Sequence, residues 1–153
     1  MADLKEGQKA PNFSLEAEDG NFYSLESFKG KKLILYFYPK DNTPGCTTEA
    51  LEFTALKNEY EKEGFVIVGV SPDSIESHKK FRDKHKLDIV LLSDPEKKCA
   101  EGYGAYGEKK NYGKTYMGII RSTFVIDENG IILKAFKNVK AGGHADKVLC
   151  ALR

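Results

Sequence analysis

The sequence predicts an α/β domain in which a mixed central sheet is flanked by helices, with a hairpin near the N-terminus. Two segments, 33–38 and 65–70, are nearly continuous apolar runs, which are typical of central strands covered on both faces. Helical patterns separate such runs along the chain. The chain has 153 residues, of which 41% are hydrophobic and 31% charged, so we expect a single domain over residues 1–153.

The remaining strands are predicted from β-rich runs and from turn signals between them. Asn129-Gly130 is a pair that favours a hairpin turn, and Asp19-Gly20 predicts a shorter hairpin near the N-terminus. These strands are expected at residues 13–15, 22–24, 88–92, 119–126 and 131–136.

Prolines mark the expected helix starts. In Thr43-Pro44, Ser71-Pro72 and Asp94-Pro95, a side-chain oxygen at the N-cap precedes proline at the first helical position. The first of these helices is expected to end near Gly64, and a last helix runs from about His144. The resulting order, β-α-β-α-β-α-β-β-α, resembles a thioredoxin-like domain, although periodicity alone leaves a flavodoxin-like arrangement open.

Composition excludes several classes of protein. Lys and Arg number 24 against 23 Asp and Glu, and this near-neutral balance lacks the basic excess of a nucleic-acid-binding protein. The apolar runs are shorter than the roughly 18 residues that a membrane span needs, and the first residues contain no export signal. Three cysteines make no disulfide framework, so we expect a cytoplasmic protein in which an active cysteine works as a thiol.

A metal or another cofactor is not expected. The histidines, His78, His85 and His144, are widely spaced, and the chain contains no Cys-x-x-Cys pair. The third histidine is interpreted as a residue at a helix start rather than as a base.

Cys46 is the most informative residue. If Thr43 caps a helix and Pro44 is its first residue, Cys46 occupies the third helical position. Unsatisfied N–H groups and the positive end of the helix dipole then face its sulfur and favour the thiolate. An ordinary buried cysteine needs no such position, so this pattern indicates a reactive thiol.

The residues around Cys46 carry a resemblance to a known family. Pro39, Thr43 and Cys46 form a Pro-x-x-x-Thr-x-x-Cys motif, and residues 36–50 resemble the bacterioferritin comigratory protein (peroxiredoxin Q) subfamily of the peroxiredoxins. The likeness spans nearly the whole chain. It continues in segments that begin at Gly7, Leu92, Tyr106, Gly113 and Arg121.

This resemblance implies an antioxidant thiol peroxidase. Such an enzyme reduces hydrogen peroxide and organic hydroperoxides to water and alcohols, draws electrons from thioredoxin or another thiol donor, and needs no cofactor. A monomer is also implied, while the composition and the short apolar runs predict no nucleic-acid or membrane partner.

The resemblance also implies roles for individual residues. Cys46 would attack the peroxide and become a sulfenic acid. Thr43 would hydrogen-bond the sulfur or the peroxide oxygen, as well as accept an N–H as a helix cap, and Pro39 would shield the site from water. Arg121, expected on strand 119–126, would stabilise the thiolate and the departing oxygen. Glu49, one helical turn after Cys46, would orient Arg121 by ion pairing.

A second, resolving cysteine is missing from its usual places. Leu51 and Arg82 occupy the positions that carry it in relatives, so a one-cysteine mechanism with an external thiol is expected. Resolution by Cys99, after local unfolding of the helix turn at Cys46, is the alternative hypothesis. Cys99 is otherwise interpreted as a spectator, and Cys150 as a core residue.

Other functions remain open from the residues alone. A thioredoxin-type reductase lacks its second sulfur, because Glu49 stands three residues after Cys46. A peroxide sensor or a thioredoxin-like partner-binding protein remains an alternative, since a sensor begins with the same chemistry. Residues 104–118 show no clear periodicity and are expected to form a loop beside the active site, with solvated lysines.

Overall fold

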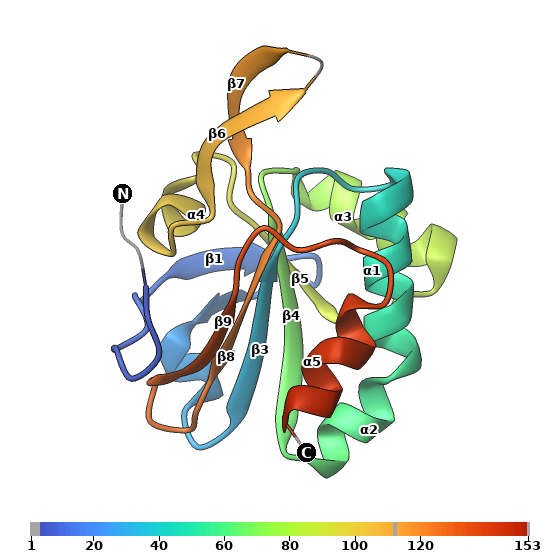
Figure 1. Ribbon diagram of the computed structural model, residues 1–153. Coiled ribbons are helices and arrows are strands. Elements are labelled where there is room, and N and C mark those ends of the chain that lie inside the picture. Colours follow the sequence, from blue (N-terminus) through green and yellow to red (C-terminus); the bar gives the residue numbers. More distant parts are fainter. Residues whose placement is uncertain (1–3, 112, 153) are drawn as a thin grey trace.

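Across the residues that the structure describes, 4–111 and 113–152, a seven-stranded mixed sheet forms the centre of the protein (Figure 1). In this computed structural model the strand order is β2-β1-β5-β4-β3-β8-β9. The strands are β1 Ser14–Ala17, β2 Phe22–Ser24, β3 Lys32–Phe37, β4 Phe65–Ser71, β5 Val90–Ser93, β8 Ser122–Ile126 and β9 Ile132–Phe136. Strands β3, β4 and β5 are parallel, whereas the remaining pairings are antiparallel.

Helices cover both faces of the sheet. They are α1 Pro44–Ala55, α2 Lys57–Lys62, α3 Ile75–His85, α4 Lys98–Gly102 and α5 His144–Leu152, with a 3-10 helix at Leu25–Phe28. Helices α1, α2, α3 and α5 lie on one side of the sheet, and α4 lies on the other (Figure 1). The predicted mixed sheet between helices is therefore confirmed, in its thioredoxin-like form.

The sheet divides the hydrophobic core into two clusters. Alternate residues of β3 point to opposite faces, so Leu35 and Phe37 join one cluster while Ile34 and Tyr36 join the other. Both sets are fully buried, because each face is covered by helices. The apolar runs of the sequence thus reflect burial on both faces.

Two of the predicted helix starts are wrong. Helix α3 begins at Ile75 rather than after Ser71, and its N-cap is Ser74, whose hydroxyl oxygen accepts the N–H of Ser77. Helix α4 begins at Lys98, beyond Asp94. The Asp94 carboxylate nevertheless accepts the N–H groups of Cys99 and Ala100. It therefore pairs otherwise unsatisfied donors in the first turn of α4, although it lies before the helix starts.

The segment expected to be a loop forms a β-hairpin instead. Strands β6 Tyr106–Asn111 and β7 Lys114–Ile119 pair antiparallel and project from the body of the protein (Figure 1). Most residues of β7 are exposed, so the apolar alternation that identifies a strand is absent. The predicted strand 119–126 is also interrupted, at residues 120–121.

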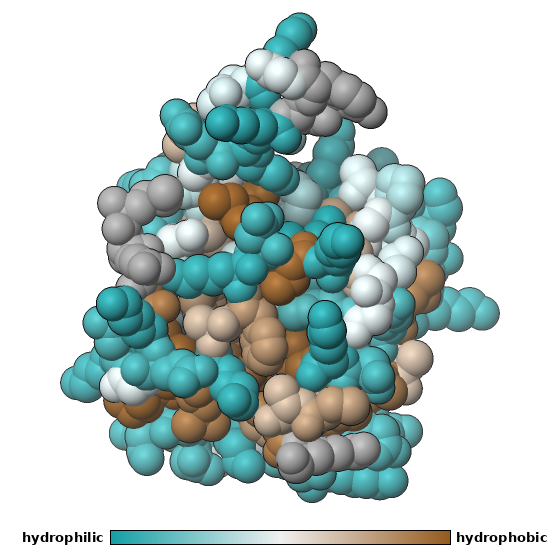
Figure 2. Space-filling model, in the orientation of Figure 1, coloured by the Kyte–Doolittle hydropathy of each residue, from teal (hydrophilic) through white to brown (hydrophobic). Residues whose placement is uncertain are grey.

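Hydrophilic side chains cover much of the face shown in Figure 2, and they separate its hydrophobic patches. Within the described part of the chain, no helix is long and apolar enough to cross a membrane.

Candidate active site

Cys46 lies in the first turn of α1, directly after the loop that leaves β3. Thr43 has the extended backbone of an N-cap, Pro44 is the first helical residue and Cys46 is the third, as predicted. Asn42 makes the preceding turn with a positive φ of 61°, a conformation that asparagine tolerates better than most residues. The Cys46 side chain is buried, with 1% of its surface exposed.

Arg121 reaches Cys46 from 75 residues further along the chain. Its Nη2 donates to Cys46 Sγ over 3.4 Å. Strand β8 pairs with β3 so that Ser122 lies opposite Phe37, which places the residue before Ser122 at the end of β3 where the Cys46 loop begins. Arg121 lies in the break between β7 and β8 rather than within a strand, and its carbonyl accepts the N–H of Val139 at 3.0 Å.

Glu49 completes this cluster. Its Oε1 accepts a hydrogen bond from Arg121 Nη1 at 2.5 Å, and its side chain is fully buried. Burial raises the pKa of Glu49 to about 7, against the opposing effect of the Arg121 guanidinium. Burial disfavours the charged guanidinium, but the neighbouring Glu49 and Cys46 outweigh this effect and raise the pKa of Arg121. The guanidinium therefore stays charged beside the sulfur.

Two further residues shape the site that sequence reasoning did not identify. A Cβ added to Gly45 would lie 3.3 Å from Arg121 Nη2. The absence of a side chain at Gly45 therefore leaves room for the guanidinium. Among the described residues, Glu49 Oε2 and the Tyr36 hydroxyl have no hydrogen-bond partner although both are buried. Burial, with Glu49 and Cys46 nearby, raises the pKa of Tyr36, so its hydroxyl stays protonated.

Thr43 departs from its expected role as a helix cap. Its hydroxyl donates to the carbonyl of Lys40 at 2.8 Å, and within the described chain its side chain forms no cap hydrogen bond. The hydroxyl therefore closes the turn between β3 and α1 in this structure, with its proton directed to Lys40 rather than to the sulfur. Pro39 is half-buried in the same loop, and its shielding role stays a prediction.

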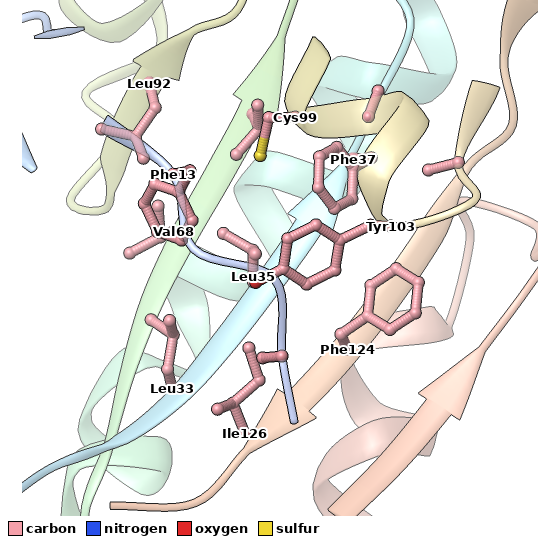
Figure 3. Close-up of a cluster of buried hydrophobic side chains, with 14 of the residues drawn as sticks. Phe13, Leu33, Leu35, Phe37, Val68, Leu92, Cys99, Tyr103, Phe124 and Ile126 are labelled. Atoms are coloured by element: carbon pink, nitrogen blue, oxygen red, sulfur yellow. The ribbon is translucent and has the colours of Figure 1, made fainter. Parts of the chain in front are cut away.

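The other two cysteines have surroundings that differ from those of Cys46. Cys99 is buried on α4, in the core cluster on the opposite face of the sheet, and Figure 3 shows its sulfur pointing into that cluster. Burial, followed by the negative charge of Asp94, raises the pKa of the Cys99 thiol strongly. Cys150 is exposed on α5, so the expectation that it packs in the core is wrong. Val148 and Leu149 take the buried positions of that helix instead.

Leu51 and Arg82 stand at the two positions where the family resemblance would place a resolving cysteine. Leu51 is 41% exposed on the outer side of α1. Arg82 on α3 donates to the buried carboxylate of Glu18 at 2.6 Å.

His144 is the first residue of α5, as predicted. Its Nε2 lies 2.7 Å from the hydroxyl of Thr123. Burial, together with the positive charges of Arg121 and Lys147, lowers the pKa of His144 to about 4, so the ring is neutral near pH 7. No cluster of metal-ligating side chains occurs among the residues that the structure describes.

Comparison with known proteins agrees with this geometry. Residues 6–135 match the AhpC/TSA family. The chain is 48% identical to peroxiredoxin Bcp of Bacillus subtilis over 147 residues, which cover 96% of this chain and 94% of that protein. Among solved structures, it is similar to the bacterioferritin comigratory protein of Xanthomonas campestris, with 43% identity, a TM-score of 0.86, and coverage of 92% and 89% of the two chains.

A second solved structure, a mutant PrxQ of Xylella fastidiosa, is 35% identical with a TM-score of 0.92 and covers 99% of this chain and 97% of its own. The matches extend over the strand, loop and helix that hold Cys46 and over the segment that supplies Arg121. The chain therefore belongs to the AhpC/TSA family, in its Bcp or peroxiredoxin Q branch, and is a thiol peroxidase.

Proposed function

We propose that Cys46 is the peroxidatic nucleophile, and that it reduces hydrogen peroxide and organic hydroperoxides with electrons from thioredoxin or another small thiol donor. The observation that carries this proposal is the contact of Arg121 Nη2 with Cys46 Sγ at 3.4 Å, in the first turn of a helix. Both the guanidinium and the helix N-terminus favour negative charge on the sulfur.

The chemistry follows from this arrangement. The Cys46 thiolate attacks the terminal peroxide oxygen, an S–O bond forms and the O–O bond breaks. The departing oxygen leaves as water or an alcohol once it gains a proton, and Cys46 becomes a sulfenic acid. Negative charge moves from sulfur to oxygen during this step, and Arg121 stabilises it at both places. Glu49 orients the guanidinium, while Thr43 and Pro39 line the approach.

The positions of the remaining thiols support a one-cysteine cycle. Cys99 and Cys46 lie in core clusters on opposite faces of the sheet, whereas a disulfide needs Cα atoms within about 7 Å. An external thiol therefore attacks the Cys46 sulfenic acid, releasing water and forming a mixed disulfide. A second thiol then displaces Cys46 as a free thiolate.

A mass measurement tests this cycle. One equivalent of peroxide is added to the reduced wild type and to Cys46→Ser, Cys99→Ser and Cys150→Ser, and intact mass is read without reductant. We expect one added oxygen on Cys46 in every protein that retains it, and none in Cys46→Ser. Loss of two hydrogens in the wild type but not in Cys99→Ser contradicts the one-cysteine cycle. A disulfide-linked dimer that Cys150→Ser abolishes also contradicts it.

Turnover separates a peroxidase that uses thioredoxin from other possibilities. With thioredoxin, thioredoxin reductase and NADPH, the wild type is expected to consume peroxide in many-fold excess over protein. A single stoichiometric burst with thioredoxin, followed by turnover with dithiothreitol, assigns the reductant to another thiol class. A single burst with both donors favours a peroxide sensor.

A further inference from the structure

Helix α3 holds the loop that leads to Cys46. This loop, residues 38–43, connects β3 to α1 and contains Asp41 and Asn42. His78 contacts Asp41 and His85 contacts Asn42, and these two histidines lie two helical turns apart on one face of α3. The sequence alone indicates no role for either histidine.

Asp41 is the centre of a buried hydrogen-bond network. Its carboxylate accepts from the Tyr38 hydroxyl at 2.6 Å, from the Ser77 hydroxyl at 2.8 Å and from His78 Nδ1 at 2.6 Å. The Asp41 N–H donates to Asp73 Oδ2 at 2.7 Å. The side chains of Asp41 and His78 are 2% and 0% exposed, so water contributes little to either group.

The partners of His78 favour its doubly protonated form. His78 Nε2 lies 2.9 Å from the carbonyl oxygen of Leu92, which can only accept, so this nitrogen carries a proton. His78 Nδ1 faces a carboxylate oxygen that also accepts from Ser77. A ring that donates from both nitrogens is an imidazolium, and it forms a buried ion pair with Asp41.

The charges around the ring agree with this assignment. Burial lowers the pKa of His78, but the hydrogen bond and charge of Asp41, the Leu92 carbonyl and the charge of Asp73 outweigh it and raise the pKa. Tyr38, the first residue of the loop, is another titratable group whose ring lies near His78. Burial is the largest of the effects that raise its pKa, so its hydroxyl stays protonated.

We propose that His78 is a positioning residue, which as an imidazolium holds Asp41 and thereby the loop that sets the first turn of α1. The inference rests on the proposed role of Cys46. Loss of the His78 charge leaves the Asp41 carboxylate buried without its counter-ion, a strongly destabilising state that the loop relieves by moving. Thr43 closes this same loop and is the last residue before α1, so the movement displaces Cys46 relative to Arg121.

The proposal predicts a particular pH dependence. Because the pKa of His78 is raised in the folded protein, its ring is charged below that pKa, and the ion pair is lost as pH rises through it. The rate constant for the reaction of Cys46 with hydrogen peroxide should therefore decline in the wild type as pH rises through the raised pKa of His78. His78→Gln should lack this decline and should react about tenfold more slowly near neutral pH, because small displacements of reacting groups can cost up to about 10²-fold.

Stopped-flow measurement of that second-order rate constant against pH tests the proposal. The matched control is Lys79→Gln, the same replacement at the next and exposed position of α3, which should keep the wild-type rate and profile. A rate and profile in His78→Gln equal to the wild type overturn the proposal. Wild-type protein in which peroxide leaves Cys46 unmodified contradicts the proposed function instead, so the two failures are distinguishable.

Two measurements cover the case in which His78→Gln does not fold. Nitrogen-15 NMR of the wild type near neutral pH should show both ring nitrogens of His78 protonated, and one unprotonated nitrogen overturns the ion pair. In Asp41→Asn, the same decline with rising pH should disappear, since His78 no longer has a carboxylate to hold. Persistence of the wild-type decline in Asp41→Asn overturns the proposal.

Discussion

Glu49 and Arg121 are in contact at 2.5 Å, and this contact aims the second guanidinium nitrogen at Cys46. Glu49 and Cys46 lie on the same face of α1, one turn apart, so one planar side chain spans both. A guanidinium suits this arrangement because it presents several N–H donors in fixed directions.

Arg121→Lys should therefore slow the reaction of Cys46 with hydrogen peroxide by about 10²-fold, the scale expected when an aimed donor is lost from a developing anion. The ammonium keeps the charge, but it is a compact group that does not span Glu49 and the sulfur. Stopped-flow kinetics measures the loss, and circular dichroism checks that the fold is kept. A wild-type rate in Arg121→Lys would show that charge alone suffices.

Glu49→Gln should change how stability depends on pH. The pKa of Glu49 is raised to about 7 in the folded protein, above its ordinary 4.5, so between these values the folded state binds more protons than the unfolded state. Wild-type unfolding free energy should therefore fall as pH rises through this window, and Glu49→Gln should remove that contribution.

Urea denaturation of both proteins at several pH values measures this difference. Peroxide reactivity of Glu49→Gln should fall at the same time, because a neutral amide orients the guanidinium less strongly. Parallel stability curves for the two proteins across this pH window would contradict the raised pKa of Glu49.

The position of Cys46 could be predicted from local sequence, but its partners could not be derived that way. Thr43-Pro44 is a short-range helix signal, and it places the start of α1 correctly. Arg121 reaches Cys46 because β8 pairs with β3, a contact between distant parts of the chain that no local pattern encodes. Only the family resemblance pointed to Arg121 before the structure was available.

The incorrect predictions have local physical causes. The β6–β7 hairpin is mostly exposed, so cross-strand hydrogen bonds define it without an apolar alternation. Cys150 follows two apolar residues, yet the helical period turns it outward while Val148 and Leu149 face the core. Thr43 is the N-cap residue by backbone conformation alone, since its hydroxyl donates to the Lys40 carbonyl and accepts no cap hydrogen bond.

Gly69→Ala should destabilise the protein. A Cβ at this position of β4 would lie 2.8 Å from Tyr36 Cζ and 2.9 Å from its hydroxyl oxygen, in a fully packed core. Overpacking of this kind typically lowers the unfolding free energy by about 1–3 kcal/mol. Urea denaturation measures the change, and Gly102→Ala, whose new methyl would approach Pro11 Cβ only to 3.8 Å, is the control. Equal stability of Gly69→Ala and the wild type would contradict the close packing of Tyr36.

Gly45→Ala should separate stability from activity. Gly45 is the second residue of α1, where alanine has a higher helix propensity than glycine by up to about 1 kcal/mol, so stability should be retained or increased. The new methyl would lie 3.3 Å from Arg121 Nη2 and 3.7 Å from Ala141 Cβ, and the guanidinium must shift away from the helix turn to accommodate it. The rate constant for Cys46 oxidation by hydrogen peroxide should consequently fall by about tenfold, as expected for a small displacement of a catalytic group.

Gly142→Ala provides the matched control for this experiment. Apart from Gly142 itself and its two chain neighbours, no atom of the described residues lies within 4 Å of the Cβ position at Gly142, and this residue precedes α5 in the segment that packs near the site. Its variant should therefore keep the wild-type rate constant. If Gly45→Ala and Gly142→Ala both react as the wild type does while Arg121→Lys remains slow, the guanidinium tolerates displacement and its exact direction does not limit the reaction. If Gly45→Ala alone is slow at undiminished stability, the missing side chain at Gly45 is part of what holds Arg121 on the sulfur.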